Sequence, residues 1–185
     1  MDMLGTVSRL AVVAIALVAA TSANALRFRR HVPKKTEHPP PVVSVDKRDS
    51  IVAAPGPFVG HPYWLGLAQC GGIYFKLNTL YTDAAVHARV VKPDPHIDAA
   101  DTKRLNEAIN IATAYFDAAE NFLRTDRELG RDDAILTYDP QSEEAGDQIK
   151  SIEAGLAAAK ACPALYQACE AVHAKICSQK LMPLS

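Results

Sequence analysis

Apolar side chains recur at spacings of three and four residues over positions 105–123, and polar side chains fill the positions between them. This pattern is typical of a helix that packs on one side. Asp98 or Asp101 suits the N-cap, because either carboxylate can accept hydrogen bonds from free amides of the first turn. Gly130 suits the left-handed position that follows a helix end. The sequence therefore predicts a helix between these points.

A second helix is predicted upstream, from about Tyr63 to Val90. Its polar positions form one narrow line along an otherwise apolar stretch, so we expect a central helix with neighbours on two sides. Gly71 and Gly72 each cost about 1 kcal/mol relative to alanine in a helix interior. Close approach of another backbone would offset that cost. The prolines within 91–95 end this helix.

A third helical region is predicted to open at Asp139-Pro140, because aspartate caps a helix well and proline is tolerated at its first position. Its apolar stripe continues to Ile176. Pro163 either kinks one long helix or starts a fourth helix. Strand patterns are nearly absent. We therefore expect an all-α protein, an antiparallel bundle of three or four helices whose connections include a loop over 131–138.

Residues 1–25 have the pattern of a secretory signal peptide, in which an apolar run over 10–20 follows Arg9 and small residues lead to Ala25. The run is too short to cross a bilayer, which takes about 20 residues. We expect cleavage after Ala25 and export to the bacterial periplasm or the cell exterior, with no transmembrane segment in the mature chain. The alternative is an uncleaved anchor.

Residues 26–62 differ from the rest of the chain, because they contain seven of the 12 prolines. Residues 26–50 have seven basic and three acidic side chains, a local net charge of +4 in a chain of net charge -1. We expect an extended, disordered, Pro-rich basic arm over 26–62, a helical bundle over 63–179 and a tail over 180–185. The arm either contacts an anionic lipid or cell-wall surface or is a solvated linker. The basic residues proposed for such contact are Arg27, Arg29, Arg30, Lys34 and Lys35.

Four cysteines in an exported chain indicate disulfides. Cysteines seven or eight residues apart on one unbroken helix lie about 10–12 Å apart, which exceeds the reach of a disulfide. Cys70 should therefore pair with a cysteine of the C-terminal region, and geometry leaves Cys162, Cys169 and Cys177 open as partners. A second bridge requires a helix break near Pro163 or after Cys169.

Other chemistry has little support in the sequence. Cys169 and His173 have a spacing that suits a metal, but such pairs arise often by chance. No zinc-protease, nucleotide-binding or nucleophile-elbow motif is present. Neighbouring carboxylates on predicted polar faces or helix starts are weak candidates for acid–base catalysis, and the positive end of a helix is the better explanation for Glu143 and Glu144. The carboxylate pairs are Asp132–Asp133, Glu143–Glu144 and Asp117–Glu120.

Asn78 and several aromatic side chains of the 63–90 helix either fill the core or line a pocket. These aromatic residues are Trp64, Tyr74, Phe75 and Tyr81. A net charge near zero disfavours a nucleic-acid partner. The sequence thus predicts an exported, non-enzymatic interaction or structural module without a cofactor, whose partner is a protein or an envelope component. The alternative is a periplasmic helical bundle that binds a small molecule or a metal.

Overall fold

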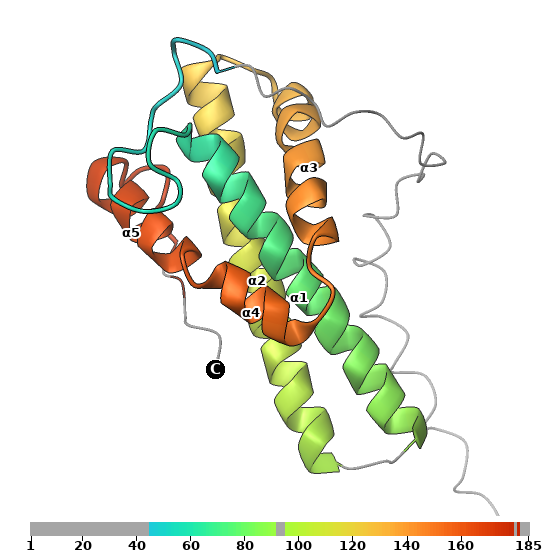
Figure 1. The fold of residues 1–185 in the computed structure, drawn as a ribbon. Coiled ribbons are helices and arrows are strands. Elements are labelled where there is room, and N and C mark those ends of the chain that lie inside the picture. The colour runs from blue at the N-terminus through green and yellow to red at the C-terminus, as the bar shows by residue number, and fades with distance from the viewer. Residues whose placement is uncertain (1–44, 92–94, 180, 182–185) are drawn as a thin grey trace, which may run out of the picture. The chain divides into compact units, whose positions relative to one another are not determined.

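The computed structural model describes residues 45–91, 95–179 and 181. The chain divides into two units, 1–39 and 40–185, and all the described residues belong to the second. Several predictions therefore lie outside the described residues: the signal peptide, cleavage after Ala25, and the surface contact through Arg27, Arg29, Arg30, Lys34 and Lys35. The described residues contain five α-helices and a single isolated β-bridge, which confirms the all-α class (Figure 1).

The two longest helices cover the two stretches for which the apolar pattern predicts helices. Helix α1 spans Tyr63–Val91, as expected, and α2 spans Pro95–Asp126. Asp98 and Asp101 are not N-caps, because α2 already begins at Pro95, and proline suits a first helical position. The left-handed residue after α2 is Glu128 (φ 57), and Gly130 is extended (φ -64) and precedes the next helix. The predicted role of Gly130 is therefore wrong.

Helix α3 spans Arg131–Asp147, so the predicted loop over 131–138 and the start at Asp139-Pro140 are both wrong. Pro140 lies inside this helix and is exposed. Asp132 and Asp133 occupy the first turn, where the positive end of the helix dipole favours carboxylates. Glu143 and Glu144 lie near the opposite end of α3, so the dipole does not explain them.

Two short helices complete the fold. Helix α4 spans Ile152–Ala159, and the Ser151 hydroxyl accepts from the Ala154 amide at 3.2 Å to cap it. Helix α5 spans Cys162–Val172 with Pro163 in its first turn. The prediction that Pro163 starts a new helix is confirmed, and the kinked long helix is wrong. None of the helices in the described part of the chain is long and apolar enough to cross a membrane.

Helix α1 is central, as predicted, because it contacts each of the other four helices (Figure 1). Its glycines explain the close packing. A Cβ added at Gly72 would collide with the backbone carbonyl of Ser142 on α3, and a Cβ added at Gly146, one turn further along α3, would lie 3.1 Å from the Gly72 carbonyl oxygen. A Cβ at Gly71 would lie 2.5 Å from the Phe116 ring of α2. The predicted close approach of a neighbouring backbone is confirmed at Gly72.

Residues 45–62 pack onto the helices, so the prediction of an extended, unpaired arm is wrong for this part. Two Arg127 nitrogens donate to the Asp49 carboxylate at 2.7 and 2.6 Å. The same guanidinium lies 5.0 Å from the centre of the Trp64 ring, a cation–π contact. The amide of Ser50 donates to the Asp126 carboxylate at 2.7 Å, and Val52 is buried.

Candidate functional site

The four cysteines form two buried disulfides. Cys70 pairs with Cys162 at a Cα–Cα distance of 5.7 Å, which ties α1 to α5, and Cys169 pairs with Cys177 at 5.9 Å. The first bridge confirms that Cys70 takes a C-terminal partner. Because α5 ends at Val172, the chain can turn back and bring Cys177 within reach of Cys169. This is the helix break after Cys169 that a second bridge requires.

The spacing of Cys169 and His173 does not produce a metal site. Cys169 is committed to its disulfide, so its thiolate is not available as a ligand. The His173 ring packs edge-on against Tyr63 at 5.3 Å and Phe122 at 5.0 Å between ring centres. Across the described residues, no three metal-ligating side chains come together.

The aromatic side chains of α1 mostly fill the core. Trp64, Tyr74 and Tyr81 are buried, and Phe75 is 48% exposed. The Asn78 amide donates to the Leu105 carbonyl at 2.9 Å and so links α1 to α2. This bond satisfies the half-buried amide and gives Asn78 a structural role.

Tyr74 is part of a cluster of three tyrosines in the core. Its ring stacks on Tyr115 of α2 at 5.6 Å, and Tyr166 of α5 meets Tyr115 edge-on at 5.3 Å. Burial raises the pKa of Tyr115 far above its ordinary value, and the neighbouring hydroxyls add to the effect. These hydroxyls therefore stay protonated in the physiological range.

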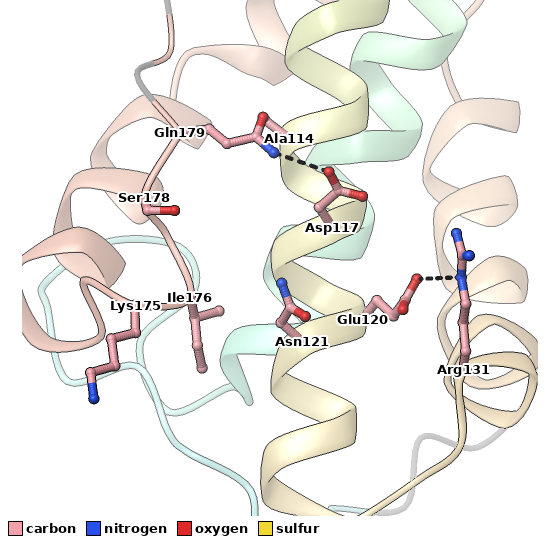
Figure 2. Close-up of a pocket in the computed structure, with 9 residues that line it drawn as sticks. All are labelled: Ala114, Asp117, Glu120, Asn121, Arg131, Lys175, Ile176, Ser178 and Gln179. Carbon is pink, nitrogen blue, oxygen red and sulfur yellow. Dashed lines mark hydrogen bonds and ion pairs between the residues drawn. The ribbon is translucent and has the colours of Figure 1, made fainter.

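One of the three carboxylate pairs, Asp117–Glu120, lies in a groove. The residues of the other two pairs, Asp132–Asp133 and Glu143–Glu144, are exposed on α3. The groove encloses about 180 Å³ between α2 and the segment that follows α5. Figure 2 shows its polar side chains, which come from α2, from the start of α3 and from the C-terminal segment. Its lining residues are Ala114, Asp117, Glu120, Asn121, Arg131, Lys175, Ile176, Ser178 and Gln179.

The two carboxylates of the groove differ in their surroundings. Arg124 and Arg131 each contact one oxygen of Glu120, at 3.3 and 3.5 Å, so two cations balance its charge. Asp117 receives one hydrogen bond on its Oδ2 from the neutral Gln179 amide at 3.0 Å. Of the two carboxylates, Asp117 therefore has the greater unused capacity to accept hydrogen bonds or to pair with a cation.

The buried hydroxyl of Tyr166 on α5 interacts with two residues that line the groove, Asp117 and Gln179. Tyr166 is 3% exposed, and its hydroxyl has no partner of hydrogen-bonding geometry in the described part of the chain. Burial raises the pKa of Tyr166, the Gln179 backbone acts in the opposite direction, and Glu170 and Asp117 raise it further. The aromatic core and the groove therefore meet at Tyr166.

The comparisons with known proteins add no relative. No protein-family model, no curated protein and no solved structure matches this chain. A function is therefore inferred from the residues and geometry of the chain itself.

Proposed function

We propose that this chain is an exported, non-enzymatic helical module that acts by contact between its surface and another component of the cell envelope. Support for export comes from the pattern of residues 1–25 and from two disulfides, which form and persist in oxidising compartments. The bridges fix α5 and the segment after it, so the module presents a preorganised surface to its partner.

The observation that carries the interaction role is an apolar stripe along the outer side of α1. Phe75 is 48% exposed, Val86 54% and Val90 79%. Between them, Thr79 and Thr82 return their hydroxyls to the carbonyls four residues earlier, at 3.2 and 2.8 Å. Because these hydroxyls already donate hydrogen bonds within the helix, they need fewer hydrogen bonds from water. Exposed apolar side chains along one helix face, with only these threonines between them, are typical of a protein contact surface.

This role is tested by crosslinking the exported chain in its own compartment and identifying what it captures. The test compares the unaltered chain with a Phe75→Ser, Val86→Ser double variant. We expect one specific protein partner, and its recovery should fall at least about tenfold in the variant, because two apolar side chains leave the interface. Equal recovery by both chains, or retention of the unaltered chain in the cytoplasm, would contradict the proposal.

A second function, binding of a small polar molecule, is favoured by the groove. Asn121 lies beside Asp117 on its α2 wall (Figure 2), and no hydrogen bond joins the Asn121 amide to another described residue. An unengaged amide next to a carboxylate suits a ligand that carries an amine. Titration with a panel of amino acids and polyamines should move the Asn121 side-chain NMR signal, and Asp117→Asn should abolish the response. An unmoved signal throughout would eliminate this function.

A further inference from the structure

The groove beside Asp117 is lined by charges of both signs. Two carboxylates, Asp117 and Glu120, and two cations, Arg131 and Lys175, belong to its lining, so the charges of the lining side chains sum to zero. A ligand that carries only positive groups would pair with Asp117 but would also lie near two cations, and like charges in contact are unfavourable. The lining therefore favours a ligand that carries a positive and a negative group together.

Arg131 is held from one side and is open on the other. Its Nε lies 3.5 Å from Oε2 of Glu120, and Arg124 contacts the other oxygen of Glu120 at 3.3 Å. Among the described residues, no other carboxylate pairs with Arg131, and its side chain is 74% exposed. The two terminal nitrogens extend beyond the Glu120 contact (Figure 2). Such a planar pair of N–H donors matches the two oxygens of a carboxylate.

Asp117 offers an acceptor to the same space. Its Oδ2 is used by the Gln179 amide at 3.0 Å, and its Oδ1 has no partner within the described part of the chain. Figure 2 shows Oδ1 turned toward the side of α2 on which Glu120 and Arg131 lie. No ion pair joins Asp117 directly to Arg131 in the part of the chain that the structure describes. The open acceptor and the open donors are therefore separated by a space that a ligand can span.

A tyrosine hydroxyl lies among the same charged groups. Tyr138 of α3 is only 8% exposed, and burial is the main cause that raises its pKa to about 12. The charges of Asp139, Glu120 and Asp117 raise the pKa of Tyr138 further, and Arg131 acts in the opposite direction. No hydrogen bond joins this hydroxyl to another residue that the structure describes. A protonated hydroxyl without a partner, on a largely buried side chain beside both charged groups, is a further donor for a bound anion.

We propose that the groove binds a free α-amino acid as its zwitterion, with the ammonium group on Asp117 and the carboxylate on the terminal nitrogens of Arg131. This inference rests on the second proposed function, the binding of a small polar molecule, since it names the ligand class of that same groove. The enclosed volume of about 180 Å³ lies below the roughly 300–1,000 Å³ of pockets for drug-sized molecules. The groove therefore suits an amino acid with a small side chain.

The test is titration of the full chain with L-alanine and with two analogues that each lack one charge, followed through the Asn121 side-chain NMR signal. Alaninamide keeps the amine and lacks the carboxylate, and N-acetylalanine keeps the carboxylate and lacks the cation. We expect L-alanine to bind at least about tenfold more tightly than either analogue, because each analogue loses one charge-assisted contact. Equal affinity for L-alanine and either analogue would overturn the proposal.

Arg131→Gln is the variant that tests the carboxylate contact. It should bind L-alanine and alaninamide with equal affinity, and its affinity for alaninamide should stay within about twofold of that of the unaltered chain, because only the partner of the carboxylate is lost. A preference for L-alanine that survives in this variant would contradict the assignment. Far-UV circular dichroism establishes that the variant is folded.

Lys103→Gln is the matched control. Lys103 is a cation on α2 that is 66% exposed and pairs with Glu107 at 3.6 Å, much as Arg131 pairs with Glu120, but it does not line the groove. This variant should keep the preference for L-alanine, and a loss of preference equal to that of Arg131→Gln would count against a specific contact.

The outcomes separate this inference from the second proposed function. If alaninamide and the diamine putrescine move the Asn121 signal as strongly as L-alanine does, the groove binds amines and only the amino acid assignment falls. If none of these ligands moves the signal, both fall. A response to L-alanine that exceeds the response to both analogues supports both.

Discussion

Removing the Cys70–Cys162 bridge should destabilise the protein more than removing the Cys169–Cys177 bridge. The perturbations are two double variants, Cys70→Ala with Cys162→Ala, and Cys169→Ala with Cys177→Ala. A disulfide stabilises chiefly by restricting the unfolded chain, and the effect grows with the length of the loop that it closes. The sequence separations are 92 and 8 residues. The two variants therefore differ in loop length while sharing the same chemistry.

The loop lengths set the expected magnitude. The chain-entropy relation gives about 4.6 kcal/mol for the 92-residue separation and about 2.5 kcal/mol for the 8-residue separation. All four cysteines are fully buried, so each double variant removes two buried sulfurs and leaves similar cavities. The cavity contributions largely cancel in the comparison. A difference of about 2 kcal/mol should remain between the two variants.

Urea unfolding under oxidising conditions, followed by far-UV circular dichroism, measures the two free energies of unfolding. The slope of the free energy against urea also reports on the unfolded state, because a chain without the long-range bridge exposes more surface and should show a larger slope. A loss for the Cys169–Cys177 variant that equals or exceeds the loss for the Cys70–Cys162 variant would refute the reasoning from loop length.

Two further predictions concern packing and charge. Gly72→Ala should cost about 1–3 kcal/mol in urea unfolding, because the added methyl group meets the rigid Ser142 backbone; Gly130→Ala, with 3.7 Å of clearance, is the control, and equal losses would contradict the prediction. Asp49→Asn should cost about 3–5 kcal/mol at neutral pH, because a neutral amide replaces the buried carboxylate that pairs with the largely buried Arg127 side chain. Burial raises the pKa of Asp49, but the hydrogen bonds and charge of Arg127 outweigh burial and hold it below its ordinary value. The contribution of this carboxylate is therefore present above the unfolded-state pKa of about 3.9 and is lost as the pH falls through the lower folded-state value. The stability difference between the two chains should shrink in acid, and a constant difference would refute this account.

The sequence was sufficient for the features that depend on long regular patterns. The α1 stretch repeats its apolar positions over 29 residues, so its kind and its central position follow from periodicity alone. The bridge from Cys70 follows from helix geometry, because the C-terminal cysteines are too far apart along one helix to pair. Close packing at Gly72 follows from the cost of glycine inside a helix.

The sequence misplaces α3, because Asp139-Pro140 has the pattern of a helix start. Proline removes one hydrogen bond from a helix interior, and here the carbonyl that loses its donor belongs to Leu136. Leu136 is 72% exposed and Pro140 is exposed as well, so water can solvate that carbonyl. The exposure of Leu136 and Pro140 therefore lets the helix continue in spite of the low helix propensity of proline. The local sequence does not reveal that exposure.

The groove and the docked 45–62 segment depend on contacts between residues far apart in sequence. Asp117 and Gln179 are 62 residues apart, and Asp49 and Arg127 are 78 apart. No local pattern marks such pairs. The prolines of the 51–60 loop indicated the absence of a helix, but not that Val52 and Phe58 would anchor the loop on α1.

The connectivity of the sulfur bridges bears on how the chain matures. In order along the chain, the first cysteine joins the second and the third joins the fourth. A polypeptide that emerges amino end first into an oxidising space presents its thiols in that same order. Each native pair is then complete before the next begins to appear. Sequential oxidation yields the correct pairing directly, and this chain should have little need for an isomerase.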